Sequence, residues 1–339
     1  MYFSDYVIDI MKRILMKTLL RTLFFCFTTV VLTIFNVSVA FASSPLVSVD
    51  WLSKNLQDPE LVIIDLRNSL DGGGHETFME GHIPGSIHSD YMKAGWRVAR
   101  NDIPGLIPSE EQFQTLARSL GVNQNSHVII VPAGVSSTDF GSSARAYWTF
   151  KSFGHEKVSI LNGGWANWNE TYPAQIERGT PKAPKRGNFT ASLTTEDYID
   201  TNGVEQIVMD RTSNTILLDG RPEKQFWGEE KHPKVLATGH IPGATLLTQS
   251  NAYDEINNKL KPTNMLIEIY GDMQSKPVVS YCNTGHWAAM NWFVLSELLG
   301  NENVTLYDGS MVEWTQDSNR PLIKEKSNFT KIKEFFRLG

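Results

Sequence analysis

The sequence predicts a duplicated α/β fold, with two doubly wound parallel-sheet domains in tandem. Short apolar runs typical of strands alternate with helical patterns along the chain, and this alternation favours a parallel sheet covered on both faces by helices. The same order of segments then occurs twice, at offsets of 145 to 158 residues. Such a repeat indicates two copies of a domain of about 130 residues.

The first copy begins with a predicted short helix over Val49–Leu56, for which Ser48 is a suitable N-cap. A continuous apolar strand over Leu61–Arg67 follows and ends in Asp65 and Arg67. The capping box Ser109-Glu-Glu-Gln112 opens a helix that Gly121 ends. Three further elements are expected in this copy: a strand over Val128–Val131, a helix over Ser143–Phe153 and a strand over Val158–Leu161.

The second copy repeats these features in order. The strand ending in Arg67 has its counterpart in Ile216–Arg221, and Gly81-His-Ile-Pro-Gly85 has its counterpart in Gly239-His-Ile-Pro-Gly243. Tyr172–Leu193 contains three prolines and no apolar period, which indicates an extended linker. The predicted organisation is a signal peptide (1–42), a first domain (46–170), a linker (171–195), a second domain (196–322) and a C-terminal tail (323–339).

The second copy contains a cysteine loop that the first copy lacks. Val278–Tyr281 is a short apolar run bounded by Pro277, which predicts a buried strand, and from Ala288 to Leu299 apolar residues recur at helical spacing. Between them lies Cys282-Asn-Thr-Gly-His-Trp287. A cysteine in front of a helix lies near backbone N–H groups without helical partners, and these groups favour the thiolate. The spacing therefore predicts an anion-binding loop with a nucleophile at its base.

The N-terminal segment has the composition of a secretory signal. Four basic residues between Lys12 and Arg21 precede an uncharged apolar run over Leu23–Val39, and Ala40-Phe-Ala42 fits a small-x-small cleavage site. Cleavage after Ala42 and export to the periplasm are expected, with an uncleaved membrane anchor as the alternative. Cleavage removes Cys26, which leaves Cys282 as the sole cysteine and excludes an internal disulfide.

Charge excludes two classes of partner. Without the four basic and two acidic residues of the signal segment, the remaining chain has a formal net charge of −8. A mildly acidic protein lacks the basic surface that nucleic acid or an anionic membrane requires, so neither nucleic-acid binding nor stable membrane association after cleavage is expected.

The cysteine count excludes a zinc site, and the eight histidines have no metal-ligand spacing. No metal and no organic cofactor is expected.

These motifs together resemble the tandem-domain rhodanese family of sulfurtransferases. The resemblance is carried by two Asp-x-Arg strand ends, two Gly-His-Ile-Pro-Gly segments and one cysteine loop in the second copy, and it spans Leu46 to Pro321. It implies a non-catalytic first domain and a catalytic second domain. It also implies transfer of a sulfane sulfur from a small anionic donor (thiosulfate, 3-mercaptopyruvate or polysulfide) through a persulfide on Cys282 to a thiophilic acceptor such as cyanide or a thiol.

The first copy agrees with that division of roles. Aligning its strand Val128–Val131 with Val278–Tyr281 puts Pro132 where Cys282 stands, and no thiol lies nearby. The segment Ala133–Ser142 is rich in small residues and is expected to form part of the cleft wall. His82 and His240 occur in both copies, so they are expected to fix loops, and Asp65 and Asp219 are expected to pair with neighbouring backbone or arginine.

The residues around Cys282 depart from the family where donor specificity is set. Thiosulfate-preferring members place Arg-Lys after the cysteine and mercaptopyruvate-preferring members place Gly-Ser-Gly-Val, whereas this loop continues as Asn283, Thr284, Gly285, His286 and Trp287. Gln225 stands where many members have an arginine. The N–H groups from Asn283 to Trp287 are expected to solvate the thiolate and the persulfide, with Gly285 permitting the turn.

Several side chains have two open roles. Arg221 either binds an anionic donor or braces the cysteine loop. His286 either assists the sulfur, by donating an N–H or a positive charge, or points to solvent. Trp287 either walls the pocket or packs under the loop. Lys231, His232 and Lys234 are expected to lie in a solvated loop, with replacement of the missing positive charge as the alternative.

Rival activities are distinguishable from the sequence. A phosphatase of the Cys-x5-Arg type needs an arginine at position 288, which is alanine, and a dithiol redox site needs a second cysteine. The remaining alternative from another class is an exported non-enzymatic module that binds or carries a sulfur or selenium species on Cys282.

Overall fold

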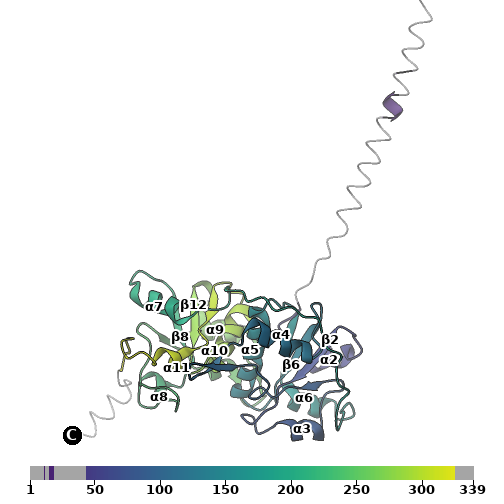
Figure 1. Cartoon of the computed structure of the whole chain (residues 1–339), viewed down its shortest axis with the longest axis horizontal. Coiled ribbons are helices and arrows are strands. Elements are labelled where there is room, and N and C mark those ends of the chain that lie inside the picture. Colours follow the sequence, from purple (N-terminus) through teal and green to yellow (C-terminus); the bar gives the residue numbers. More distant parts are fainter. Residues whose placement is uncertain (1–10, 12–14, 19–42, 325–339) are drawn as a thin grey trace, which may run out of the picture. The chain divides into compact units, whose positions relative to one another are not determined.

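The computed structural model describes residues 11, 15–18 and 43–324, and Ser43 begins the compact unit that contains both predicted domains (Figure 1). The predicted apolar core of the signal segment and most of the predicted C-terminal tail lie outside the described residues. Within the described part of the chain, no helix combines the length and the hydropathy needed to cross a bilayer.

The first half of the unit contains a five-stranded sheet in the order β1-β7-β6-β2-β3, and all four strand pairings are parallel. Its elements in chain order are β1 (Leu46–Val47), α2 (Val49–Asn55), β2 (Leu61–Asp65), α3 (His75–Glu80), β3 (Ile87–His88), β4 (Val98–Arg100), β5 (Ile103–Leu106), α4 (Glu110–Ser119), β6 (His127–Val131), α5 (Ser137–Ser152), β7 (Val158–Leu161) and α6 (Gly164–Thr171).

The second half contains a four-stranded parallel sheet in the order β13-β12-β8-β9. Its elements are α7 (Thr201–Met209), β8 (Ile216–Asp219), α8 (Glu223–Phe226), β9 (Thr245–Leu246), η1 (Gln249–Ala252), β10 (Tyr253–Asp254), β11 (Lys259–Leu260), α9 (Thr263–Tyr270), η2 (Gly271–Ser275), β12 (Val278–Tyr281), α10 (His286–Phe293), the π-helix η3 (Val294–Leu298), β13 (Val304–Leu306) and α11 (Ser310–Trp314).

The two sheets repeat one topology, which confirms the predicted fold class. β6, β7, β2 and β3 of the first sheet correspond to β12, β13, β8 and β9 of the second. The correspondence extends to the sheet edge, where β1 pairs with β7 and Tyr198 forms a parallel bridge to Leu306 of β13. Cys282 and Pro132 therefore follow equivalent central strands.

Local sequence signals start the helices as expected at two sites. The side chain of Ser48 accepts the N–H of Trp51 at the start of α2, and Ser109 forms a reciprocal capping box with Gln112 at the start of α4. Each such cap contributes about 1 kcal/mol of stability.

Two other helices begin earlier than predicted. α5 starts at Ser137 rather than Ser143, because the Ser136 side chain accepts the N–H of Asp139 and caps the helix there. α10 starts at His286 rather than Ala288, directly after Gly285. In both cases residues interpreted as loop form the first turn of a helix.

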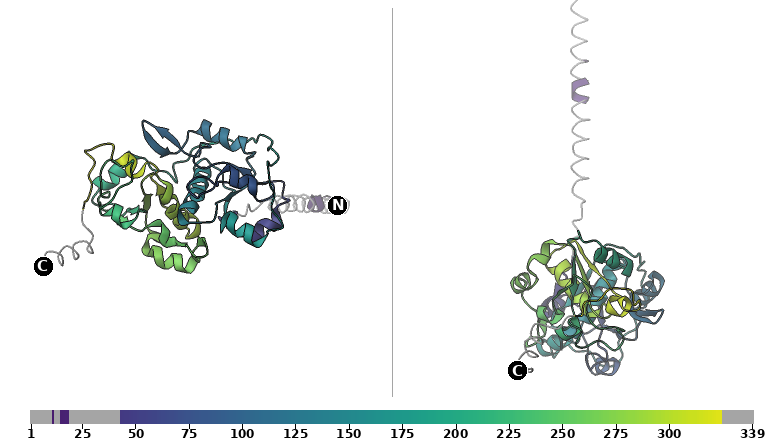
Figure 2. Two further views of the ribbon diagram at one scale, coloured as in Figure 1. Left: turned by 90° about the horizontal axis from the view of Figure 1, so that it is seen from below. Right: turned by 90° about the vertical axis from the view of Figure 1, so that its left-hand side faces the viewer.

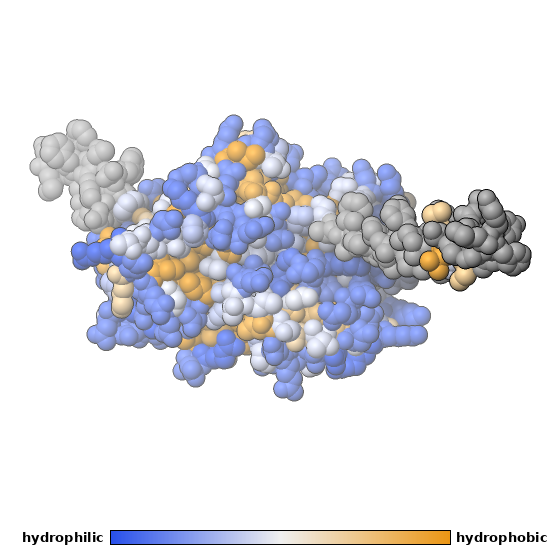
Figure 3. Space-filling view, turned by 90° about the horizontal axis from the view of Figure 1, so that it is seen from above, coloured by the Kyte–Doolittle hydropathy of each residue, from blue (hydrophilic) through white to orange (hydrophobic). Residues whose placement is uncertain are grey.

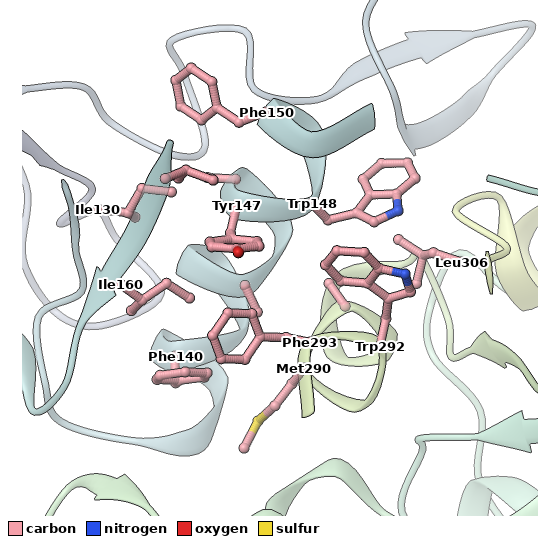
Figure 4. Packing of buried hydrophobic residues seen from close by; sticks show 14 of the residues in the cluster. Ile130, Phe140, Tyr147, Trp148, Phe150, Ile160, Met290, Trp292, Phe293 and Leu306 are labelled. Carbon is pink, nitrogen blue, oxygen red and sulfur yellow. The ribbon is translucent and has the colours of Figure 1, made fainter. Parts of the chain in front are cut away.

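The main hydrophobic core is continuous between the two halves. α5 and α10, which follow the equivalent strands β6 and β12, pack side by side between the sheets (Figures 1 and 4). The ring of Tyr147 on α5 meets that of Phe293 on α10 edge to face, with centroids 4.9 Å apart, and Phe140 meets Phe293 at 5.8 Å. Burial of each such ring contributes about 2–3 kcal/mol to stability. These contacts therefore stabilise the packing of the two halves against one another.

A hairpin extends the first half over the second. β4 and β5 pair antiparallel, and Ile103 at the start of β5 packs against the hydrophobic cluster that contains Leu217 and Tyr307 of the second half (Figure 2). Beyond the hairpin, the N–H of Ile107 donates to the Asp308 carboxylate at 2.6 Å. The hairpin thus brings residues near position 100 toward the cysteine loop.

The segment 172–193 contains no helix or strand, as predicted, although it is held against the first half. Phe189 is fully buried within the aromatic cluster of Phe113 and Phe150. The face of the molecule in Figure 3 is mainly hydrophilic with several separate apolar patches.

Candidate active site

Cys282 is the residue that follows β12, at the carboxyl end of the central strand of the second sheet. Its thiol is free and its exposed fraction is 1%. The chain turns through Asn283 and Thr284 to Gly285, whose φ of +69° is left-handed, and α10 begins at His286. Ligands of parallel α/β sheets bind beyond the carboxyl ends of the strands, so the position of the thiol is typical of a functional site.

Ser310 fixes the shape of the cysteine loop. Its Oγ accepts the N–H of Cys282 at 3.0 Å and that of Gly285 at 3.1 Å, while its hydroxyl donates to the carbonyl of Tyr307. The N–H of Met311 donates to the Cys282 carbonyl. Ser310 was not among the residues predicted from the sequence, although its position directly after the repeated segment Leu306–Gly309 places it at the end of the strand next to β12.

The bracing by Ser310 corrects one expectation about the loop. Gly285 donates its N–H to Ser310 and cannot offer it to the sulfur. For the N–H groups of Asn283, Thr284, His286 and Trp287, no acceptor is found among the residues that the structure describes. These four donors remain available for a bound anion.

His286 is a buried bridge to the first half and does not point to solvent. Its Nε2 lies 2.9 Å from the carbonyl oxygen of Thr138, and its Nδ1 lies 3.0 Å from the Tyr91 hydroxyl. A carbonyl only accepts, so Nε2 carries the proton and Nδ1 accepts from Tyr91. Burial is the main cause that lowers the pKa of His286, to about 3. The ring is therefore neutral near pH 7, and both expected catalytic uses of it are wrong.

Trp287 walls the pocket and also joins the two halves. Its Nε1 donates to Thr138 Oγ1 at 3.2 Å, so Thr138 in the first turn of α5 receives hydrogen bonds from both His286 and Trp287. Thr138 itself lines the cavity beside Cys282. The predicted contribution of Ala133–Ser142 to the cleft wall is confirmed at this residue.

Arg221 braces the fold and does not line the cavity. It is 1% exposed, forms a bidentate pair with Asp219 and donates from Nη2 to the carbonyl of Gly239 at 2.8 Å. Arg67 makes the equivalent bonds to Asp65 and to the carbonyl of Gly81. Arg221 therefore braces the Gly-His-Ile-Pro-Gly segment through its first glycine. None of these hydrogen bonds reaches the cysteine loop, so the predicted bracing of that loop by Arg221 is not observed within the described residues.

The two repeated histidines fix the same segments, as expected. His82 Nδ1 is paired with the Phe78 carbonyl and His240 Nδ1 with the Phe226 carbonyl, each at 2.8 Å, and each imidazole stacks on the ring of that phenylalanine. They take no part in the cavity.

Gln225 interacts with the cysteine loop. Its Oε1 accepts from Asn283 Nδ2 at 2.8 Å, and Asn283 is 3% exposed. Gln225 therefore supports the loop from α8 and is not among the residues that line the cavity. The Oδ1 atom of Asn283 is buried and has no protein partner in the described part of the chain.

The equivalent loop of the first half is filled by a carboxylate. Asp139, 2% exposed, accepts the N–H groups of Ala133, Gly134 and Val135, the residues that follow Pro132. Burial raises the pKa of Asp139 to about 7, against the lowering effect of these three donors. The Asp139 carboxyl group thus occupies the backbone donors of the loop after β6, which accounts structurally for a half without a free anion site.

A cavity of about 320 Å³ opens at Cys282 and is formed by both halves. Its lining residues are Leu70, Met92, Arg97, Pro104, Gly105, Thr138, His232, Lys234, Cys282, Asn283, Thr284, His286 and Trp287. His232 and Lys234 thus lie beside the site rather than only in a solvated loop, and Arg97 was missed because nothing in its local sequence connects it with Cys282.

A second cavity in the described part of the chain lacks the features of this site. A larger cavity of about 550 Å³ beside His75 in the first half contains no thiol. Within the described residues no group of three or more His, Cys, Asp or Glu side chains is arranged to hold a metal ion.

Comparisons with known proteins agree with this architecture. The rhodanese-like domain model matches residues 48–171 and 204–317. The 3-mercaptopyruvate sulfurtransferase of Escherichia coli (strain K12) is 32% identical over 284 residues, covering 81% of this chain and 96% of the relative. The sulfur carrier protein TtuD of Thermus thermophilus is 28% identical over 294 residues, covering 82% and 96%.

A solved structure shows the same fold. The crystal structure of the 3-mercaptopyruvate sulfotransferase SseA from Escherichia coli superposes with a TM-score of 0.66 at 30% identity and covers 79% of this chain and 99% of that one. Since both halves match the family and relatives match along almost their entire length, the chain belongs to the rhodanese-like family and is a sulfurtransferase with two tandem domains.

Proposed function

We propose that Cys282 carries the transferred sulfur as a persulfide, which it takes from a small anionic donor and passes to a thiophilic acceptor such as cyanide or a thiol. The observation that carries the proposal is the position of the thiol. Cys282 lies at the base of a cavity, at the carboxyl end of β12, next to four backbone N–H groups without protein acceptors in the described chain.

The chemistry requires a thiolate nucleophile and a leaving group. The Cys282 thiolate attacks the sulfane sulfur, a new S–S bond forms, and the donor fragment departs with the electron pair of the broken bond. With thiosulfate the S–S bond breaks and sulfite leaves. With 3-mercaptopyruvate the C–S bond breaks and the enolate of pyruvate leaves, then takes up a proton. The acceptor next attacks the outer sulfur and the Cys282 thiolate departs.

The backbone donors suit the persulfide better than the resting thiol. No hydrogen bond to the sulfur of Cys282 occurs within the described chain, whereas an added sulfur extends the side chain by about 2.05 Å. The N–H groups of Asn283, Thr284, His286 and Trp287 are then the available donors for the negative charge on the outer sulfur. The carboxyl group of Asp139 in the equivalent loop supports this role, because its oxygens accept three successive backbone N–H groups there.

Lys234 supplies part of the positive charge that the loop itself lacks. It lines the cavity from the segment before Gly239 and forms no ion pair within the described chain. We assign Lys234 the role of attracting the anionic donor. This role needs only a positive charge near the cavity, so an exposed and flexible lysine side chain can fulfil it.

Intact mass spectrometry tests the function directly. The purified protein is treated separately with thiosulfate, 3-mercaptopyruvate and polysulfide, with Cys282→Ser in parallel. We expect a gain of one sulfur on the wild type only, removed by cyanide with formation of thiocyanate over many turnovers. Loading without turnover would favour a carrier, the function named for the Thermus thermophilus relative. Full transfer by Cys282→Ser would show that the proposal is wrong.

A further inference from the structure

Arg97 is a cation of the first half that lies in the cavity of the second. It directly precedes β4 and lines the same cavity as Cys282. Its guanidinium lies over the ring of Tyr91, 4.7 Å from the centroid, and Nη2 lies 3.1 Å from Met92 Sδ. Tyr91 in turn donates to His286, so the aromatic platform under Arg97 is tied to the helix that carries the cysteine loop.

No anion compensates Arg97 among the residues that the structure describes. The buried arginines Arg67, Arg145 and Arg221 each pair with an aspartate, whereas no ion pair of Arg97 is found in the described part of the chain. A guanidinium has five N–H donors, and an aromatic face and a thioether are weak partners for them. The donors of Arg97 are therefore available to a ligand in the cavity.

Gly105 leaves the space between Arg97 and the cysteine loop open. A methyl group placed on Gly105 would lie 3.1 Å from Cβ of Thr284 and 3.7 Å from Nη1 of Arg97. The φ of Gly105 is +89°, a conformation that other residues seldom adopt. The guanidinium and the loop thus face one another across a position that has no side chain.

The composition of the cavity indicates the kind of donor. The cavity is lined by two positively charged side chains, Arg97 and Lys234, which come from different halves, and no acidic side chain lines it. Leu70, Met92, Pro104 and Trp287 form an apolar wall. A volume of about 320 Å³ is at the small end of the range for small-molecule sites, and apolar surface beside two cations suits an organic anion.

We propose that Arg97 is a specificity-determining residue, which binds the carboxylate of an organic sulfur donor while the sulfur meets Cys282. The proposal rests on the function proposed above and adds that the non-catalytic half contributes directly to the donor site. The flat guanidinium held over Tyr91 is oriented in advance for a bidentate carboxylate. Lys234, an exposed lysine, can attract the charge but does not fix its geometry.

The first experiment requires no sulfur transfer. Cys282 is alkylated in the full-length protein with iodoacetate or with iodoacetamide, reagents of similar size of which only iodoacetate is anionic, and the rates are read from the mass of the Cys282 peptide. We expect Arg97→Ala to lower the iodoacetate-to-iodoacetamide rate ratio about tenfold, with the iodoacetamide rate within about twofold of wild type.

Lys93→Ala is the matched control, since Lys93 is an exposed cation of the same segment that lies outside the cavity and pairs with Asp90. Its rate ratio should equal that of the wild type. A ratio for Arg97→Ala equal to that of Lys93→Ala would overturn the proposal. So would an equal fall in both alkylation rates, because that result would place the effect on the thiol rather than on the bound anion.

Steady-state kinetics then test the specificity. With 3-mercaptopyruvate, Arg97→Ala should raise KM about tenfold and leave kcat within about twofold, and Arg97→Lys should recover only part of the loss because it lacks the planar fork. With thiosulfate, which has no carboxylate, the rise in KM should be smaller; an equal rise would overturn the assignment to a carboxylate. If no donor loads Cys282, the proposed function fails while the alkylation ratio still decides whether Arg97 binds anions.

Discussion

Arg145 and Asp308 form an ion pair across the two halves of the molecule, with Nη2 3.3 Å from Oδ2 and neither side chain more than 1% exposed. The same carboxylate accepts the N–H of Ile107, and Nη2 of Arg145 also donates to the carbonyl of Gly105. A Cβ on Gly285 would lie 2.3 Å from Arg145 Nη1 and 2.7 Å from the Asp308 carbonyl oxygen. The pair therefore forms the surface on which the cysteine loop rests.

Removing one partner of this pair should be strongly destabilising. Arg145→Met leaves the Asp308 carboxylate buried without its cation, which is expected to lower the free energy of unfolding by about 3–5 kcal/mol. Burial already raises the pKa of Asp308. Urea titration at pH 7 measures the change.

The double variant Arg145→Met, Asp308→Leu separates two effects on the free energy of unfolding: the loss of the ion-pair attraction and the cost of leaving one buried charge unpaired. Because it buries no charge, it should be less destabilised than the sum of the two single variants. If the two effects simply add, the ion pair is not an interacting unit.

Gly285→Ala should lower the stability of the protein and the reactivity of Cys282 more than an alanine substitution at a glycine with free space around it. Both Gly285 and Gly243 have positive φ, +69° and +79°, but a methyl group on Gly243 meets nothing within 4 Å. Gly243→Ala is thus expected to cost about 1 kcal/mol through backbone strain alone. Gly285→Ala adds the clash with Arg145 and Asp308 and should also reduce alkylation and sulfur loading of Cys282.

Thermal unfolding and Cys282 alkylation of the two alanine variants measure these effects together. Equal losses of stability with normal thiol reactivity in both would mean that the packing behind Gly285 does not shape the site.

The stability of the protein should decrease in mild acid, partly because of His286. Burial lowers the pKa of this histidine from 6.5 to about 3, so between these pH values the unfolded chain binds a proton that the folded chain does not. The free energy of unfolding therefore falls as the pH drops from 6.5 toward 3, by at most ~1.4 kcal/mol per pH unit for one proton.

His286→Gln tests this contribution, since glutamine can donate to Thr138 and accept from Tyr91 without titrating. The slope of unfolding free energy against pH between 6.5 and 4.5 should become shallower than in the wild type. His155, whose pKa burial lowers to about 4, keeps part of the slope in every variant. A slope for His286→Gln identical to that of the wild type would contradict the assignment.

Export remains a prediction from the sequence. We expect protein recovered from the periplasm of a bacterial host to begin at Ser43, because Ala40 and Ala42 fit the cleavage rule. N-terminal sequencing of periplasmic and membrane fractions measures this, and Ala42→Arg should block processing. Intact chains confined to the membrane fraction of the unaltered protein would favour the uncleaved anchor.

The sequence by itself determined the fold class, the duplication and the position of the thiol. These features depend on local patterns: apolar runs of strand length, the caps Ser48 and Ser109, and a cysteine directly after Val278–Tyr281. Such patterns fix strand and helix starts because their hydrogen bonds and burial involve residues close in the chain. The pairing of Arg67 with Asp65 and of Arg221 with Asp219 is likewise local.

Tertiary structure alone decided which residues surround the thiol. Arg97 and Arg145 belong to the half without cysteine, and their distance from Cys282 in the sequence concealed any relation to it. The segment Ala133–Ser142 was expected in the cleft wall, but only the structure shows that Thr138 is the residue that lines the cavity. The role of His286 was also undecidable locally, because burial against Tyr91 and Thr138 makes it neutral and occupies both ring nitrogens. Electrostatic and packing interactions depend on distance in space and not on distance along the chain. The charged residues of the first half that lie near Cys282 can therefore be identified only from the folded structure, in which α5 packs against α10.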